Sequence, residues 1–230
     1  MLIVIPDVLN ARALDVVRER LVAAGDAWVD GRVTAGHQGA AVKHNLQLDE
    51  LSPVARELGA LIVGVLERHS LFLSAALPSR IYPPLFNRYD GTTGMHFGSH
   101  IDGAVRLLPG TAEKIRTDLA ATLFLADPGS YDGGELEIED VYGTQSIKLP
   151  AGQMVLYPAT SRHRVLPVTR GSRLASFFWV QSMVREDARR ALLFELDMAI
   201  VRLSADAPGH PSLVDLAGCY HNLVRMWGEP

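Results

Sequence analysis

Two neighbouring residues and a third, distant one have the types and spacing of a metal centre. His100 and Asp102 are separated by a single residue, and His163 follows much later in the chain. Residues i and i+2 of a β-strand point to the same face, so His100 and Asp102 can reach one ion from a single strand. Two imidazoles and a carboxylate form the facial triad of non-haem Fe(II) sites, whose remaining coordination positions stay open. The spacing therefore predicts a metal site made of His100, Asp102 and His163.

Arg173 adds a positive charge that suits a co-substrate with two carboxylates. It follows the turn residue Gly171 and enters the apolar segment Leu174–Trp179, where an arginine without a partner is costly to bury. A guanidinium binds a carboxylate through two parallel hydrogen bonds, so we expect Arg173 to bind the co-substrate. Tyr89 and Tyr157 are further candidates for hydrogen bonds to it, although a buried tyrosine often has a structural partner instead.

These residues lie in segments that follow one another in a characteristic order. The segments are Arg88–Asp102, Asp132–Leu136, Gly152–His163 and Gly171–Arg173. The ordered set resembles the iron(II)/2-oxoglutarate dioxygenases, and within them the prolyl-4-hydroxylase-like branch. The chain resembles the bacterial PKHD-type hydroxylases nearly end to end, including the closing segment Gly218–Leu223. The resemblance implies an oxidoreductase, a dioxygenase that uses 2-oxoglutarate to hydroxylate a prime substrate.

The resemblance also implies the cofactors. Fe(II) is expected in the metal site, 2-oxoglutarate and O2 as co-substrates, and L-ascorbate (vitamin C) as the reductant of iron after uncoupled turnover. Some relatives carry Arg-x-Ser on the co-substrate strand, but here Ser176 lies three residues after Arg173 and should face the other way. The prime substrate, a peptide or a small molecule, stays open, and a link to iron homeostasis follows from the resemblance alone. Residues 91–99 and 103–117 flank the first ligand strand and are expected to form the substrate mouth.

Other functions use similar residues. Catalytic zinc is also bound by two histidines and a carboxylate, but zinc hydrolases often take two ligands from a His-Glu-x-x-His helix, which this sequence lacks. The alternative we keep is a non-catalytic jelly-roll protein that senses metal or 2-oxoglutarate. A sensor can lose the arginine or one metal ligand, and this chain keeps all four residues. A cupin-like isomerase is a third option, which would not require 2-oxoglutarate.

His96 competes with His100 for the role of metal ligand. On an unbroken strand both histidines would share the face of Asp102. We expect His100 to be the ligand because it is one step along that face from Asp102. Gly98, between the histidines, permits a bend that turns His96 away.

The predicted elements form a β domain with helices around it. Helices are expected at residues 10–24, with Asn10 as N-cap, and from Ser52 to about His69, with Pro53 at the first helical position. Strands are expected at Leu2–Ile5, Arg80–Tyr89, Asp118–Ala126, Glu135–Glu139, Gln145–Leu149, Met154–Tyr157, Arg164–Val168 and Arg173–Met183. Many short strands around a metal site favour a double-stranded β-helix, or jelly roll, with flanking helices.

The C-terminal part of the sequence returns to helix. Residues 187–203 and a last helix from Ser212, with Asp215 completing a capping box, form an expected hairpin. Its apolar stripe consists of Leu213, Leu216, Tyr220, Leu223, Val224 and Trp227. The stripe can be buried on the barrel or on a second copy of the chain, and we favour a homodimer. Cys219 is expected in the core. We therefore divide the chain into a jelly-roll dioxygenase domain, residues 1–184, and a helical extension, residues 185–230.

Composition restricts the partners. The chain has 230 residues and a net charge of −4, with acids and bases mixed, whereas a nucleic-acid surface would be strongly basic. No apolar segment is long enough to span a bilayer, and Leu2–Ile5 is too short for a signal-peptide core. The single cysteine excludes an internal disulfide. These features predict a cytoplasmic protein with no nucleic-acid or membrane partner.

Overall fold

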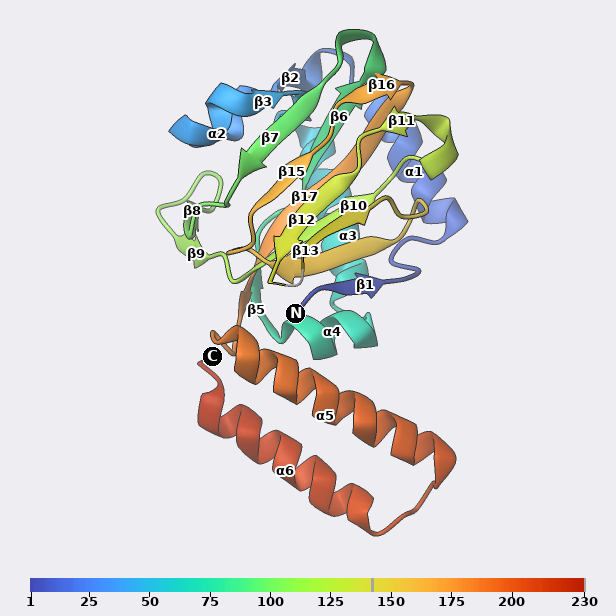
Figure 1. Ribbon diagram of the computed structural model, residues 1–230, viewed down its shortest axis with the longest axis vertical. Coiled ribbons are helices and arrows are strands. Elements are labelled where there is room, and N and C mark those ends of the chain that lie inside the picture. The colour runs from blue at the N-terminus through green and yellow to red at the C-terminus, as the bar shows by residue number, and fades with distance from the viewer. Residues whose placement is uncertain (142, 230) are drawn as a thin grey trace.

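Two antiparallel sheets form a jelly roll, with helices on the outside of the larger sheet and a helical hairpin at the C-terminus (Figure 1). The computed structural model describes residues 1–141 and 143–229. The mainly β fold with flanking helices that the sequence predicts is confirmed.

The larger sheet is organised around two long apolar strands. Its order is β1 (Ile3–Ile5), β14 (Met154–Pro158), β10 (Leu119–Phe124), β17 (Ser172–Ser182), β6 (Leu85–Asp90), β4 (Leu46–Leu48) and β2 (Trp28–Asp30), and β5 (Pro78–Ile81) also pairs with β17. Every residue of β10 is buried, as expected for a continuous apolar run that is covered on both faces.

The smaller sheet carries the two predicted histidine ligands. Its order is β13 (Gly143–Ile147), β12 (Leu136–Asp140), β15 (His163–Val165), β7 (His96–His100) and β3 (Lys43–His44). Two short ribbons complete the barrel, one of β11 (Asp132–Gly133) with β16 (Val168–Arg170) and one of β8 (Val105–Leu107) with β9 (Lys114–Arg116).

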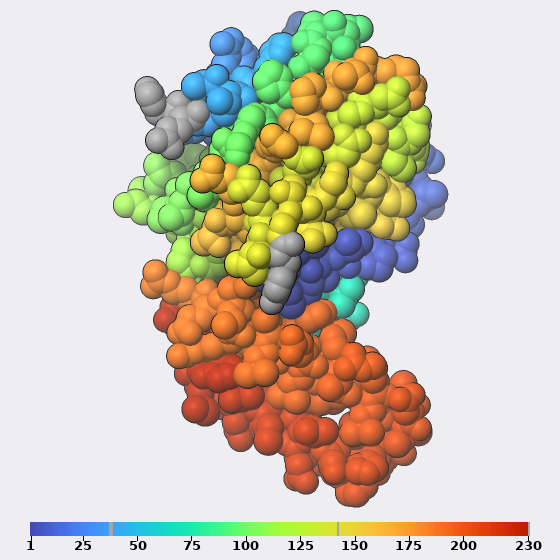
Figure 2. Space-filling view, in the orientation of Figure 1, coloured from blue at the N-terminus to red at the C-terminus, as the bar shows by residue number. Residues whose placement is uncertain are grey.

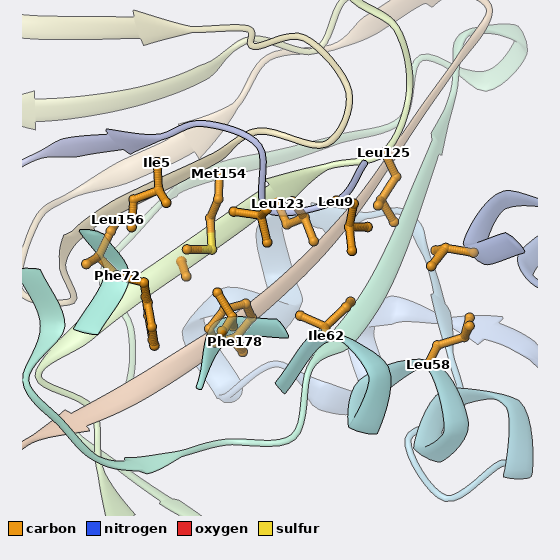
Figure 3. Packing of buried hydrophobic residues seen from close by; sticks show 14 of the residues in the cluster. Ile5, Leu9, Leu58, Ile62, Phe72, Leu123, Leu125, Met154, Leu156 and Phe178 are labelled. Atoms are coloured by element: carbon orange, nitrogen blue, oxygen red, sulfur yellow. The ribbon is translucent and has the colours of Figure 1, made fainter. Parts of the chain in front are cut away.

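Alternation along β10 divides the apolar residues into two clusters. Ala121 and Leu123 face the helices, while Ala120 and Phe124 face the smaller sheet. The helices over the first face are α1 (Ala11–Val22), α3 (Pro53–Leu66) and α4 (Ser70–Ala76). Figure 3 shows the packing of this first cluster, whose members include Leu58, Ile62, Phe72, Leu123, Met154 and Phe178. Each fully buried side chain of this kind contributes roughly 1.5–3 kcal/mol, so the helices hold the larger sheet in place behind the site.

Both predicted helix starts are correct, and one predicted helix end is wrong. Asn10 caps α1 through the Ala13 N–H, and Ser52 caps α3. The second helix ends at Leu66 rather than near residue 69, and α4 follows after a bend of 88°. Within the described residues no single helix is long and apolar enough to cross a membrane, and only this bent pair reaches that length and composition together.

Prolines divide two of the predicted strands. Arg80–Tyr89 is in fact β5 and β6, separated by Pro83 and Pro84, and Arg164–Val168 is β15 and β16, separated at Pro167. Proline has no N–H to donate to a neighbouring strand, so it interrupts the pairing.

The segment between the first two predicted helices contains elements that the sequence did not predict. Strands β2 and β4 extend the larger sheet, β3 pairs with β7, and helix α2 (His37–Val42) lies between β2 and β3. These strands are two or three residues long, too short for a visible alternation of apolar residues. Pairing with distant strands creates them.

The C-terminal hairpin forms as predicted, with helices α5 (Asp187–Asp206) and α6 (Ser212–Trp227). It projects from the jelly roll as a separate lobe, coloured orange and red in Figure 2. Its base is held to the domain by an ion pair of 2.8 Å between the N-terminal amine of Met1 and Asp187, and by a hydrogen bond from Ser74 on α4 to Asp197.

Two expectations about this hairpin are wrong. Pro211 occupies the N-cap position of α6, and the Ser212 N–H donates to His210 Nδ1, so no capping box forms. Cys219 is exposed rather than in the core. The apolar stripe is only half-buried, and its end near Trp227 packs on a small cluster that includes Leu193.

Candidate metal centre and co-substrate site

The structure brings the three predicted metal ligands together. His100 ends β7 and His163 begins β15, and the two residues face each other across the paired strands. Asp102 lies just beyond the end of β7 rather than within it. One Asp102 carboxylate oxygen is 3.9 Å from His100 Nε2, and the other is 3.9 Å from His163 Nε2. The three candidate ligand atoms lie within 4.8 Å of one another, so one ion can contact all of them. We call these residues the metal triad.

Hydrogen bonds orient both imidazoles with Nε2 toward the ion position. His100 Nδ1 lies 2.9 Å from the carbonyl oxygen of Gly98, and His163 Nδ1 lies 3.0 Å from that of Ser161. A carbonyl accepts, so each Nδ1 carries the proton and each Nε2 keeps its lone pair for a metal. Burial, and then the neighbouring His163, lower the pKa of His100 to about 4, which keeps this ring neutral and able to coordinate.

His96 lies apart from the metal triad. It pairs with His44 of β3, and the two rings are 6.0 Å apart. The pairing of β7 with β15 is irregular, because Phe97 and His100 stand opposite Val165 and His163. This β-bulge places Phe97 on the face of His100, and the two rings stack at 3.6 Å. Gly98 lies within this bulge, where a bend was expected, and a Cβ there would also lie 2.8 Å from Val42 of α2.

Arg173 is a buried cation without a carboxylate partner among the described residues. Its side chain is 1% exposed, and Nε has no hydrogen-bond acceptor. Nη1 reaches Asn87 Oδ1 only at 3.5 Å, and the guanidinium lies 5.3 Å from the ring centres of Tyr89 and Phe124. A buried charge is stable only when it is paired, so this position fits an anionic ligand. The neighbouring Ser176 faces away and donates to the Leu85 carbonyl, as predicted.

Tyr89 and Tyr157 both line the same cavity as the metal triad and Arg173. Burial raises the pKa of Tyr89 to about 12, against the opposing effect of Arg173. Burial, and then the charge of Asp102, raise the pKa of Tyr157 well above its ordinary value. Both phenols therefore stay protonated and can donate a hydrogen bond to an anionic ligand.

Gly134 of the Gly133–Gly134 pair lies against Arg173, and Gly133 lies against the Pro167 carbonyl. Both glycines have positive φ, 71° and 69°. A Cβ on Gly134 would lie 3.0 Å from Cδ of Arg173 and 2.9 Å from Val168. Glycine therefore fits both positions, because a Cβ would be strained at positive φ and would collide with these neighbours.

The cavity has a volume of about 470 Å³ and extends well beyond the triad. Its lining includes Lys43, Arg106, Phe97, Phe177 and Trp179, none of which sequence reasoning had singled out. Arg106 comes from the segment that was expected to form the substrate mouth. No sequence pattern around Lys43 indicated a place in the site, because β3 is defined only by its pairing with β7.

Comparisons with known proteins agree with this geometry. Residues 84–181 match the 2OG-Fe(II) oxygenase superfamily, and residues 187–229 match the PKHD-type hydroxylase C-terminal domain. A PKHD-type hydroxylase of Paraburkholderia xenovorans is 61% identical, and the alignment covers 100% of both chains. A PKHD-type hydroxylase of Xanthomonas campestris pv. campestris is 63% identical, again over 100% of both chains.

Solved structures share the fold at low sequence identity. A prolyl-4-hydroxylase of Pseudomonas putida is 19% identical, with a TM-score of 0.52 over 79% of this chain and 92% of that one. A prolyl hydroxylase of Trichoplax adhaerens, in complex with a hypoxia inducible factor peptide, is 14% identical, with a TM-score of 0.57 over 83% and 86% of the two chains. These similarities support the jelly-roll architecture.

Proposed function

Since this chain belongs to the PKHD-type hydroxylase family and is a 2-oxoglutarate-dependent dioxygenase, we propose that His100, Asp102 and His163 hold its Fe(II) and that Arg173 binds 2-oxoglutarate. Bound together there, the metal and 2-oxoglutarate supply the activation of O2 that hydroxylates the prime substrate and releases succinate and CO2. The observation that carries the proposal is the buried, unpaired Arg173 guanidinium in the cavity of the metal triad.

Each of the proposed site residues has a part in positioning the reactants. Arg173 pairs with the distal carboxylate of 2-oxoglutarate, while Tyr89 and Tyr157 donate hydrogen bonds to it. The two imidazoles are fixed by backbone carbonyls, so they need no rearrangement when the ion binds. The apolar walls of the cavity exclude water from the reacting atoms.

Turnover and metal content together test the proposal. The purified protein, supplied with Fe(II) and 2-oxoglutarate, should release succinate, and Ala at any position of the metal triad should abolish both iron binding and succinate release. Arg173→Ala should keep the iron and weaken 2-oxoglutarate binding. A protein that binds both ligands and releases no succinate under any condition would revive the sensor alternative, which the match to hydroxylases disfavours.

The remaining expectations are part of the same proposal. L-ascorbate should prolong turnover by re-reducing the iron, which a time course with and without ascorbate tests.

We propose a division into the dioxygenase domain, residues 1–184, and the helical extension, residues 185–230. A cytoplasmic location without nucleic-acid or membrane partners is consistent with the net charge of −4. The link to iron homeostasis rests on resemblance, and comparing growth of a deletion strain in iron-poor and iron-rich medium tests it.

We also propose that the hairpin forms a homodimer. Its exposed apolar side chains include Leu192, Val201, Val214 and Met226, with exposed fractions from 51% to 78%. Exposed large apolar side chains of this kind are common at interfaces between copies of a chain. Light scattering of the full chain tests this, and a strictly monomeric protein would contradict it.

A further inference from the structure

Besides Arg173, the cavity is lined by two further cationic side chains, Lys43 and Arg106. Lys43 on β3 is 6% exposed, and its ammonium donates to Thr34 Oγ1 at 3.1 Å and to Gln47 Oε1. The same nitrogen lies 5.1 Å from the ring centre of Phe97 and 5.8 Å from that of Phe177. All of these contacts are neutral, so the charge of Lys43 has no direct counter-charge among the residues that the structure describes.

Arg106 approaches the same point from β8. Its guanidinium lies 4.4 Å from the ring centre of Trp179 and 5.2 Å from that of Tyr82. Its Nη1 donates to the Thr34 carbonyl at 3.4 Å, so Lys43 and Arg106 converge on one residue. Neither cation forms an ion pair within the described part of the chain. The indole N–H of Trp179 is buried and also has no acceptor.

The carboxylates that act on Lys43, which are Asp102 and Asp30, are already engaged, and so is Glu50, which binds the Tyr82 hydroxyl beside Arg106. Asp102 belongs to the metal triad, Asp30 is bound by Arg32, and Glu50 accepts a hydrogen bond from Tyr82 at 3.1 Å. Burial, and then repulsion by Arg106, lower the pKa of Lys43 to about 7. This end of the cavity therefore has donors and positive charge but lacks an acceptor that would match them.

The rings that contact Lys43 and Arg106 belong to β17 and lie several residues along that strand from Arg173. Arg173, Phe177 and Trp179 all line the cavity from this strand. At about 3.3 Å per residue, Phe177, which contacts Lys43, lies roughly 13 Å along the strand from Arg173, and Trp179, which contacts Arg106, lies roughly 20 Å from it. A molecule with the short carbon chain of 2-oxoglutarate, bound at Arg173 and the metal, leaves Lys43 and Arg106 free.

We propose that the prime substrate carries a carboxylate or similar oxyanion, which Lys43 and Arg106 bind, and that its apolar part lies against Phe97, Phe177 and Trp179. Phe97 stacks on His100 and also contacts Lys43, so a substrate anchored there extends directly past the metal triad. This inference rests on the proposed function, because it takes the Arg173 end of the cavity to be filled by 2-oxoglutarate.

Benzoate and benzamide are suitable probes because they share a shape and differ in charge. Ligand-observed NMR should be run on the full chain loaded with Mn(II), which prevents turnover, and saturated with 2-oxoglutarate. We expect benzoate to bind at millimolar concentration and benzamide to bind more weakly. Lys43→Met and Arg106→Met should each weaken benzoate binding about tenfold or more, the usual consequence of losing a hydrogen bond to a charged group. Arg106 lies on an outer ribbon, so its variant stays informative if the buried Lys43 variant unfolds.

Lys114→Met is the matched control. Lys114 is exposed on β9, the other strand of the same ribbon, and it does not line the cavity. This variant should bind benzoate like the parent. No benzoate binding, equal binding of benzamide, or unchanged binding in both cavity variants would overturn the inference. Binding of 2-oxoglutarate, measured separately, should be kept in both variants. If the parent fails to bind 2-oxoglutarate, the proposed function fails, while benzoate binding that depends on Lys43 would still establish the anion site.

Discussion

Arg173→Met separates a ligand-binding role from a structural role for the buried guanidinium. Methionine keeps the apolar stem of the side chain and removes its charge. Arg173 is 1% exposed, and no carboxylate balances its charge in the described residues. Removing an unpaired buried charge is favourable, whereas losing its contacts with Tyr89 and Phe124 costs about 0.5–2 kcal/mol. These effects oppose each other, so the unfolding free energy of the ligand-free protein should change by less than about 1 kcal/mol.

The same substitution should remove most of the stabilisation by 2-oxoglutarate. A charge-assisted hydrogen bond contributes about 1.5–3 kcal/mol, which corresponds to about ten- to hundredfold in affinity. A ligand present at about 100 times its Kd stabilises a protein by about 2.7 kcal/mol, and a hundredfold weaker ligand at that concentration stabilises it by only about 0.4 kcal/mol. Arg173→Lys should recover part of the difference, because an ammonium lacks the planar fork.

Urea unfolding with Mn(II), with and without 2-oxoglutarate, measures both quantities. Arg164→Met is the control, because Arg164 is exposed on β15, is paired with Glu137 and lies outside the cavity. A parent-like response of Arg173→Met to 2-oxoglutarate would refute the co-substrate assignment. A loss of more than about 3 kcal/mol in the ligand-free protein would show that Arg173 has a structural role that the reasoning omits.

Further predictions concern the metal, the pH, a glycine and the hairpin. His96→Ala should keep one iron per chain by metal analysis, whereas Ala within the metal triad should lose it. The free energy of unfolding of the metal-free protein should fall by up to about 3 kcal/mol between pH 6.5 and about pH 4, because the unfolded chain protonates His100 and the folded one does not. Urea unfolding at several pH values measures this, and His100→Gln should remove most of the pH dependence. Gly134→Ala should destabilise the protein by about 1–3 kcal/mol and should weaken 2-oxoglutarate binding, which calorimetry measures. Gly64→Ala is the control, because Gly64 lies on α3 with open space around it, and this variant should show neither effect. Deletion of residues 187–230 should give an aggregating protein by light scattering.

Local signals in the sequence were sufficient for the parts of the fold that are buried and long. Strand β10 is a nearly continuous apolar run and β17 has the apolar centre Phe177–Val180, while the helix starts at Asn10 and Ser52 depend on neighbouring residues only. The triad could be proposed because its residue types are rare in combination and their order is informative. The strand and the helix starts are set within a few residues, and the triad is indicated by residue types and order, so one sequence reveals them.

Features that depend on distant pairing could not be read in the same way. Lys43 and Arg106 lie in elements of two and three residues, and only the folded barrel brings both to Thr34. The exposed side of α6 is another example, because its apolar stripe is regular but the domain covers only one end of it. Periodicity shows that a face is apolar, and it does not show what lies opposite that face.

The β-bulge in β7 favours His100 over His96 as the proposed metal ligand, for a reason that the sequence argument contained only in part. A strict period of two would place His96 and His100 on one face, but an extra residue between Phe97 and His100 reverses the faces. The bulge therefore removes His96 from the metal and brings Phe97 beside His100, where its ring also contacts Lys43. One local irregularity thus both sets the ligand and builds the wall between the metal triad and the cationic end of the cavity. If the bulge matters in this way, deleting Ser99 should disrupt iron binding and benzoate binding together, whereas His96→Ala should disturb neither.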